Sequence, residues 1–265
     1  MKKLLAILLA VSMVFCFAAC GGAEEEATEQ LDSEYVIANG KLVVGITNFA
    51  PMDYPDENGE WIGFDADMAR AFAESLGVEV EFIEIDWDNK IMELDSKNID
   101  CVWNGMTLTD EVKAAMGTSN AYCNNAQVIV VPADKAEEFA TAEACAELNF
   151  AAEAGSAGEA ALMDLGYNVT ALSTQADALM EVASGTSDAC VIDLLMAGAM
   201  IGEGTSYENL VYTAHLNSEE YGVGFRQGSD LVDLLNQFFI EAYANGTMLE
   251  IAEKYGVQES LVEQK

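Results

Sequence analysis

The chain has 265 residues, of which 46 are acidic and 11 are lysine or arginine, so its formal net charge is −35. A nucleic-acid binder needs clustered lysine and arginine to displace counterions from phosphates, and this sequence has no such cluster. The single histidine, His215, leaves a Ser-His-Asp hydrolase only one possible base and excludes an HExxH zinc site. Hydrophobic residues make up 51% of the chain, so we expect one large or two medium globular domains rather than a disordered acidic chain.

The N-terminus has the pattern of an export signal. Lys2 and Lys3 precede an uncharged, almost wholly apolar run over residues 4–19, which is short for a bilayer-spanning helix. Two alanines then precede Cys20, and this ending resembles the lipobox of bacterial lipoproteins, in which the cysteine receives a diacylglyceryl group. The alternative is a plain secretory signal with an incidental cysteine. We therefore expect a lipoprotein signal peptide over residues 1–19, lipidation at Cys20 and an outward-facing, lipid-anchored position on the cell membrane, extracellular or periplasmic.

Residues 20–33 are rich in glutamate and contain one leucine, so they cannot bury a core. We predict that this segment is a solvated acidic tether. The acidic excess of the whole chain has two interpretations. It steers a cationic ligand, or it only keeps an exported protein soluble, which requires no site.

Beyond the tether, strand patterns alternate with helix patterns, and the series starts twice. The first series has predicted strands over 41–46, 78–85, 99–103 and 127–131, with helices over 65–76 and 89–96 and a short helix capped by Thr109. The second series has predicted strands over 149–152, 169–172, 189–193 and 221–225, with helices over 156–165, 175–184, 194–200, 230–244 and 247–255. This alternation is typical of parallel sheets with helices on both faces.

Four cysteines follow Cys20. Cys101 and Cys190 lie inside predicted strands, where cysteine behaves as a small buried apolar residue. Cys123 and Cys145 are able to pair in an exported protein, but the sequence gives no distance between them and we expect no bridge. Because no CxxC spacing occurs, we predict no metal site and no cofactor.

A series of short motifs runs along the chain, at residues 41–45, 49–52, 58–67 (NGEWIGFDAD), 86–88, 99–100, 105–109, 155–159, 188–193 and 245–248. Taken in this order, they resemble the extracellular solute-binding proteins of polar-amino-acid ABC transporters. Each motif alone is weak, but the ordered set covers nearly everything from Lys41 to Val257.

The resemblance implies an α/β, two-lobed periplasmic-binding-protein fold, in which each lobe is a mainly parallel sheet flanked by helices. Lobe 1 is expected over residues 34–131 plus 222–265, and lobe 2 over residues 132–221. Two crossing segments, near residues 130–133 and 222–225, are expected to form a hinge that closes the lobes on a ligand.

Candidate site residues come from the same alignment and from the rule that ligands bind at the carboxyl ends of strands in open α/β sheets. Gly105 and Gly155 each follow a predicted strand and precede a hydroxyl residue, Thr107 or Ser156. Free backbone N–H groups at such positions suit an anionic group. Asp193 ends a strand, where its carboxylate suits a ligand ammonium. The alternative is that the hydroxyls and this carboxylate only cap helices.

Two aromatic residues are predicted to form pocket walls: Phe49, which also offers a face for a cation, and Trp87. The alternative for both is an ordinary place in the core. The complete predicted set of ligand-binding residues is Phe49, Trp87, Asn104, Gly105, Thr107, Ser156 and Asp193.

One departure from the family pattern bears on the ligand. The family usually reads Gly-Met-Thr-Ile-Thr-Pro-Glu-Arg, and its arginine grips the ligand α-carboxylate, but the segment 105–112 ends in Val112. A hydrogen bond to a charged group is worth roughly 1.5–3 kcal/mol, or about ten- to a hundredfold in affinity. Neither Arg70 nor Arg226 matches another pocket position, and Lys113 lies about 100° further round the helix. Three outcomes remain open: an amino acid held by other donors, a ligand without an α-carboxylate such as an amine, or the loss of tight binding.

The resemblance implies a solute-binding subunit, without enzymatic activity, that delivers a small amino-acid-like solute to ABC permease subunits. Its expected partners are a small-molecule ligand (an amino acid or an amine), the permease, and the membrane through the lipid anchor, with no nucleic acid. An alternative is an enzyme on the same fold, similar to cyclohexadienyl dehydratases, but the sequence offers no carboxyl–histidine pair to act as its acid and base. A sensor or adhesin without transport is a further alternative.

Overall fold

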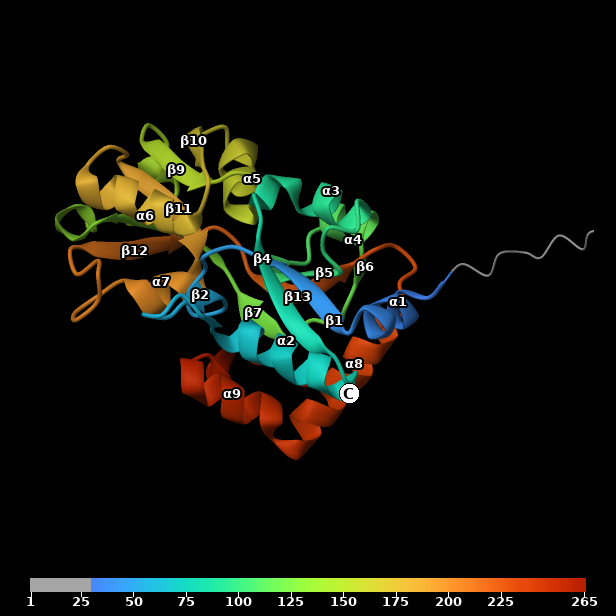
Figure 1. Ribbon diagram of the computed structural model, residues 1–265. Coiled ribbons are helices and arrows are strands. Elements are labelled where there is room, and N and C mark those ends of the chain that lie inside the picture. Colours follow the sequence, from blue (N-terminus) through green and yellow to red (C-terminus); the bar gives the residue numbers. More distant parts are fainter. Residues whose placement is uncertain (1–29) are drawn as a thin grey trace, which may run out of the picture. The chain divides into compact units, whose positions relative to one another are not determined.

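The computed structural model describes residues 30–265 of the chain (Figure 1). The predicted signal peptide, Cys20 and the tether up to residue 29 lie outside the described residues. Within the described part, no helix combines the length and the apolar character that a membrane span requires.

The predicted tether is too long at its C-terminal end, because helix α1 (Asp32–Asn39) begins inside it. Ser33 is buried, and its backbone N–H donates to the carboxylate of Asp230 over 3.0 Å. Asp32 forms an ion pair with Arg226 over 3.1 Å. The acidic composition of the segment does not show these two contacts, which fix the helix to distant parts of the chain.

The first sheet has the strand order β4-β1-β5-β13-β6, and β7 also pairs with β13. Its strands are β1 (Lys41–Ile46), β4 (Glu79–Glu84), β5 (Cys101–Thr107), β6 (Gly117–Thr118), β7 (Cys123–Asn125) and β13 (Glu219–Phe225). Strands β4, β1 and β5 are parallel, whereas β13 runs antiparallel to β5, β6 and β7. The helices of this part are α1, α2 (Phe64–Ser75), α3 (Lys90–Asp95), α4 (Asp110–Ala115), α8 (Leu231–Asn245) and α9 (Thr247–Tyr255), with a small hairpin of β2 (Tyr54–Pro55) and β3 (Trp61–Ile62). We call this sheet and its helices the first lobe.

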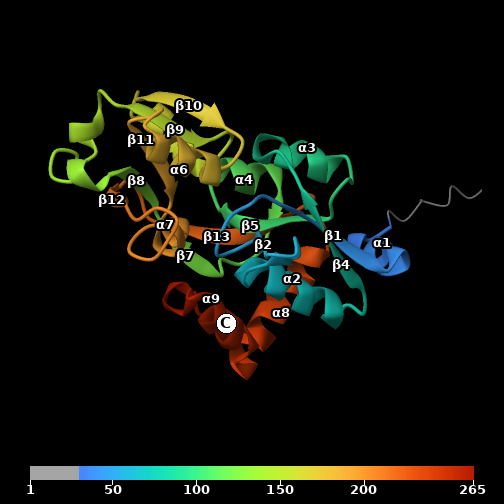
Figure 2. The same ribbon diagram turned by 60° about the vertical axis from the view of Figure 1, so that its left-hand side comes forward.

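The second sheet has the strand order β10-β9-β11-β8-β12 (Figure 2). Its strands are β8 (Gln127–Pro132), β9 (Asn149–Glu153), β10 (Asn168–Leu172), β11 (Ala189–Asp193) and β12 (Leu210–His215). Strands β10, β9 and β11 are parallel, and β8 is antiparallel to both β11 and β12. Helices α5 (Ala157–Asp164), α6 (Gln175–Ser184) and α7 (Leu194–Met200) complete what we call the second lobe.

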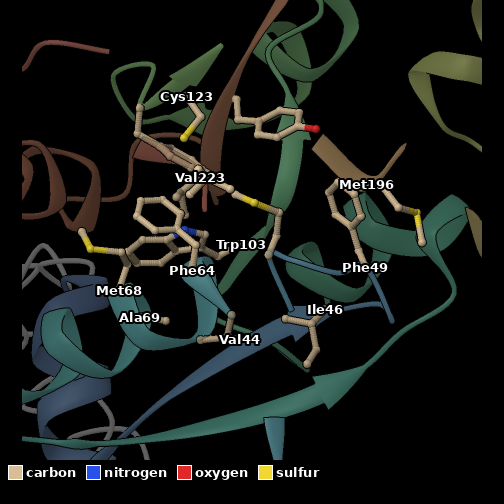
Figure 3. Packing of buried hydrophobic residues seen from close by; sticks show 14 of the residues in the cluster. Val44, Ile46, Phe49, Phe64, Met68, Ala69, Trp103, Cys123, Met196 and Val223 are labelled. Carbon is tan, nitrogen blue, oxygen red and sulfur yellow. The ribbon is translucent and has the colours of Figure 1, made fainter. Parts of the chain in front are cut away.

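The central strands β5, β8, β9 and β11 are buried on both faces, which explains why they are mostly apolar apart from a few polar residues, mainly at their ends. In β8, Val128 and Val130 belong to a core cluster shared with α6 and α7, whereas Ile129 and Val131 pack with Leu162 of α5. This two-residue alternation distributes one strand between two helical layers. Figure 3 shows the corresponding core of the first lobe, in which residues of β1, α2 and β5 pack together: Val44, Ile46, Phe64, Met68, Ala69 and Trp103.

The two-lobed α/β fold is confirmed, but both sheets are mixed rather than mainly parallel, and the predicted crossing points are wrong. Strand β8 pairs only with strands of the second sheet, and β13 pairs only with strands of the first. The chain therefore passes between the sheets at Ala126 and at residues 216–218, not near residues 130–133 and 222–225. A β-branched run pairs its backbone N–H and C=O groups with neighbouring strands over its whole length. The chain therefore crosses from one sheet to the other only where this pairing ends.

Cys101 and Cys190 are buried, as predicted, and the described residues Cys123 and Cys145 are also free and buried. Thr109 caps α4, as predicted, by accepting a hydrogen bond from the backbone N–H of Val112 over 3.1 Å.

Candidate ligand-binding site

A cavity of about 560 Å³ opens between the two lobes. From the first lobe it is lined by the end of β5, by the turn that begins at Trp87, and by α4. From the second lobe it is lined by the ends of β9 and β11 and by the first residues of β8 and α5. The carboxyl ends of parallel strands from both sheets thus face one space, as expected for ligand sites in open α/β sheets.

Six of the seven predicted residues line this cavity: Trp87, Asn104, Gly105, Thr107, Ser156 and Asp193. The predicted wall residue Phe49 does not line it. The ring of Phe49 makes an edge contact with Tyr221, with ring centroids 6.3 Å apart, and lies behind Gly105. A Cβ atom on Gly105 would lie 2.2 Å from Cε1 of Phe49, so the alternative of a core aromatic describes Phe49 correctly. The ring supports the cavity wall from behind.

Asp193 has the most hydrogen-bonded carboxylate of the cavity. Its oxygens accept hydrogen bonds from the side chains of Asn125, Gln127, Gln175 and Tyr221. Although α7 begins directly after it, Asp193 makes no side-chain cap bond, so the capping alternative is wrong for this residue. Burial, reinforced by the nearby Glu219 carboxylate, raises the pKa of Asp193 to about 7.

Thr107 and Asn104 are both held by polar partners rather than left free. The hydroxyl of Thr107 donates to Oε1 of Glu219 over 2.9 Å. The side chain of Asn104 accepts from the backbone N–H of Thr47 over 2.9 Å and donates to the Thr47 hydroxyl over 2.8 Å. These bonds fix the end of β5 in one geometry, which suits a preformed cavity wall.

The backbone N–H groups of Gly105 and Gly155 are not free, so the prediction is wrong for these two groups. The N–H of Gly105 donates to Oδ2 of Asp65 over 2.6 Å, and the N–H of Gly155 donates to Oε2 of Glu159 over 2.8 Å. Ser156 caps α5 by accepting from the backbone N–H of Glu159 over 3.1 Å. Since a buried N–H group needs a partner, protein carboxylates occupy the places that a ligand carboxylate was expected to take.

Lys90 is a cavity residue that the sequence analysis missed. Its ammonium donates to the carbonyl oxygen of Trp87 over 3.2 Å and, across the gap between the lobes, to that of Gly155 over 2.9 Å. It also lies over the Trp87 ring, 4.8 Å from the centroid. Burial lowers the pKa of this lysine. No apolar period or motif distinguishes Lys90 in the sequence, so only its place in the fold reveals it.

Glu153 is a second missed residue. It ends β9, lines the cavity and is 3% exposed. Burial and the neighbouring Asp193 raise the pKa of its carboxyl to about 8, and Lys90 opposes that rise. Its Oε1 atom is buried without a hydrogen-bond partner. The strand-end rule that selected Asp193 also applies to Glu153, so the sequence did carry a signal for it.

Acidic side chains dominate the charged lining of the cavity. The acidic lining residues are Asp88, Asp110, Glu111, Glu153, Glu159, Asp164 and Asp193. Lys90 is the one lysine or arginine among the lining residues, all of which belong to the described part of the chain. Val112 also lines the cavity and is 6% exposed, so the position of the expected arginine falls in the wall but carries no charge.

The two lobes, with a polar cavity between them, define a binding protein of the periplasmic type. Residues 42–258 match the model of the family described as bacterial extracellular solute-binding proteins, family 3, and the chain belongs to that family. This membership supports the prediction that the protein binds a solute rather than catalysing a reaction.

Known relatives resemble nearly the whole chain. It is 26% identical to the "arginine-binding extracellular protein ArtP" of Bacillus subtilis over 96% of this chain and 98% of the relative. It also resembles the structure of holo ArgBP from T. maritima, with 31% identity and a TM-score of 0.75, over 84% of this chain and 99% of that one. A solute-binding protein of an ABC uptake transporter from Streptococcus pneumoniae, with bound histidine, has 28% identity and a TM-score of 0.80, over 89% of this chain and 100% of that one.

Proposed function

We propose that the protein captures a small cationic solute, foremost an amino acid with a basic side chain, and delivers it to an ABC permease. The observation that carries the proposal is the cavity between the lobes, which seven acidic side chains and a single lysine line. A cation gains from such a field, whereas an anion is repelled. The relatives named for arginine and the relative with bound histidine support the same class of solute.

Each part of an amino acid has a suitable partner in the cavity. The carboxylate of Asp193 suits the α-ammonium, because a charge-assisted hydrogen bond is about twice as strong as a neutral one. Trp87 offers an aromatic wall beside the ammonium of Lys90. A lysine has three N–H donors, and Lys90 uses two of them on carbonyl oxygens, which leaves one for an α-carboxylate.

A cationic amine without an α-carboxylate is the second candidate. Two observations favour it: Val112 stands where the family's arginine is expected, and protein carboxylates occupy the N–H groups of both Gly105 and Gly155. Donors for a ligand carboxylate are therefore few, whereas acceptors for an ammonium are plentiful.

Titration calorimetry with matched pairs tests the proposal. Arginine and agmatine differ only in the carboxylate, as do ornithine and putrescine. Glutamine and glutamate serve as controls because they have no cationic side chain. Tighter binding of the amino acid in each pair supports the first candidate, and tighter binding of the amine supports the second. Binding of glutamate or glutamine more tightly than every cation would contradict both.

The proposal includes closure of the lobes and attachment to the membrane. We infer that the lobes pivot at Ala126 and residues 216–218, where the chain crosses between sheets. We also infer that residues 1–19 direct export and that Cys20 carries the lipid. Metabolic labelling with palmitate is expected to mark the wild-type protein and not Cys20→Ala, and equal labelling of both would contradict the anchor.

A further inference from the structure

We propose that Glu153 forms a second cation subsite beside Asp193, so that the preferred solute carries two cationic groups. This inference rests on the proposed function, because it requires that the cavity take a cationic solute. The two carboxylates end neighbouring parallel strands, β9 and β11, and both line the cavity.

Asp193 and Glu153 differ in the hydrogen bonds that their carboxylates accept from the protein. Asp193 accepts hydrogen bonds from four side chains, whereas Oε1 of Glu153 is buried and has no partner. A buried polar atom without a partner destabilises the protein, and more so when it is charged. A ligand donor that reaches Glu153 removes this cost, so the cavity gains most from a ligand that bonds there.

Lys90 does not fill the place beside Glu153. Its ammonium donates to the carbonyl oxygens of Trp87 and Gly155, and the ion pairs of the described residues do not include Lys90 with Glu153. The lysine acts on the carboxyl only from a distance, by opposing the rise in its pKa. Lys90 therefore leaves Oε1 of Glu153 without a hydrogen-bond partner, and a donor group of a solute in the cavity is able to supply one.

The pair of carboxyls indicates a dication rather than a monocation. Glu153 and Asp193 end neighbouring strands and both line the cavity, and Lys90 is the one lysine or arginine among the described lining residues. A solute with two cationic groups places one group beside each carboxyl, whether it is a basic amino acid or a diamine.

Binding at this subsite is coupled to a proton. Four groups face the Glu153 carboxyl from different elements: Asp193 of β11, Lys90 of α3, Gln175 of α6 and, just beyond β1, Thr47. Because the raised pKa keeps the carboxyl largely protonated near neutral pH, a cation that docks there displaces a proton. The affinity for a dication is therefore expected to rise as the pH increases from about 6.5 to about 8.5.

Calorimetry with ornithine and norvaline tests the inference, because these amino acids differ in the distal ammonium. The wild-type protein is expected to prefer ornithine by at least about tenfold, as the loss of one charged hydrogen bond predicts. Glu153→Gln is expected to lose most of this preference and to keep its affinity for norvaline. The control Glu147→Gln, which changes an exposed glutamate of the second lobe, is expected to retain the preference.

Different failures have different meanings. If folded Glu153→Gln keeps the full preference for ornithine, the inference is wrong while the proposed function stands. If wild-type protein binds norvaline as tightly as ornithine, the cavity does not sense the side-chain cation, and both the inference and the preference for a basic side chain are wrong. If wild-type protein binds none of the arginine, agmatine, ornithine, putrescine and norvaline probes, the proposed function fails and the inference fails with it.

A second measurement needs no variant and remains decisive if Glu153→Gln does not fold. Titration of the wild-type protein in buffers of different ionisation enthalpy counts the protons released on binding. Ornithine is expected to release more protons near pH 7 than norvaline, because only ornithine reaches both carboxyls. Equal release by the two ligands would overturn the inference.

Discussion

Raising the pH of the ligand-free protein from about 5.5 to about 8.5 is expected to lower its stability steadily. Buried carboxyls with raised pKa values cause this, among them Asp65, Asp193 and Glu153. Burial raises the pKa of Asp65 to about 7, that of Asp193 to about 7 and that of Glu153 to about 8. The unfolded chain loses these protons at much lower pH, near the ordinary values for Asp and Glu. The folded state therefore binds more protons over this interval, and the free energy of unfolding falls as the pH rises.

The size of the effect follows from the pKa differences. One pKa unit corresponds to about 1.4 kcal/mol, so at pH 5.5 each carboxyl contributes on the order of 2–3 kcal/mol that is almost gone at pH 8.5. For a chain of this size, 1 kcal/mol shifts Tm by roughly 2–4 °C, so the three carboxyls together predict a fall of about 10 °C or more.

Thermal melts followed by circular dichroism measure this directly. About 0.2 M salt screens the large surface charge, so that general repulsion between acidic groups contributes little. The exposed-site variant Glu147→Gln is expected to show the same pH profile as the wild type, whereas Glu153→Gln is expected to show a shallower one. A Tm that stays level or rises between pH 5.5 and 8.5 would refute the reasoning, because the buried carboxyls would then be ionised in the folded protein.

Three substitutions in the cavity test the binding geometry. Asp193→Ala is expected to lower the affinity for arginine by more than about tenfold in titration calorimetry, and an unchanged affinity would exclude its contact with the ammonium. Val112→Arg is expected to strengthen the binding of arginine but not of agmatine, since only arginine has a carboxylate; an equal effect on both would mean that this part of the wall does not meet the α-carboxylate. Glu159→Ala is expected to lower Tm by a few degrees through loss of the hydrogen bond from the N–H of Gly155 to the Glu159 carboxylate, and to favour arginine over agmatine by freeing that N–H. An unchanged ratio of the two affinities would show that the ligand does not reach that N–H group.

The sequence predicted most of the fold because its apolar patterns are regular and its helix ends are marked. The predicted helices over 175–184 and 194–200 and the predicted strand over 189–193 agree with α6, α7 and β11 residue for residue. Thr174 caps α6, and Gly185 ends it in the left-handed conformation. In contrast, β12 was missed because its residues do not alternate regularly between apolar and polar, and α1 was missed because its stabilising contacts come from residues far along the chain.

The location of the site was also predictable, but its electrostatics were only partly so. Six of the predicted residues line one cavity, as the position of the strand ends led us to expect. The capping pattern of Ser156 with Glu159 was also visible in the sequence. That pattern places the Glu159 carboxylate at the N-terminus of α5, but the N–H that it binds is that of Gly155 and not that of the cap residue Ser156. The bond from Gly105 to Asp65 and the place of Lys90 depend on how distant segments pack, and no local pattern reports them.

The central claim is that a cationic solute lies in the gap between the lobes. Titration calorimetry of the wild-type protein with arginine, ornithine, putrescine, glutamine and glutamate tests this claim most directly. We predict saturable binding, one molecule per chain, of at least one of the three cationic compounds and none of glutamate. Tighter binding of glutamate or glutamine than of every cationic compound, or no binding of any of the five, would contradict it.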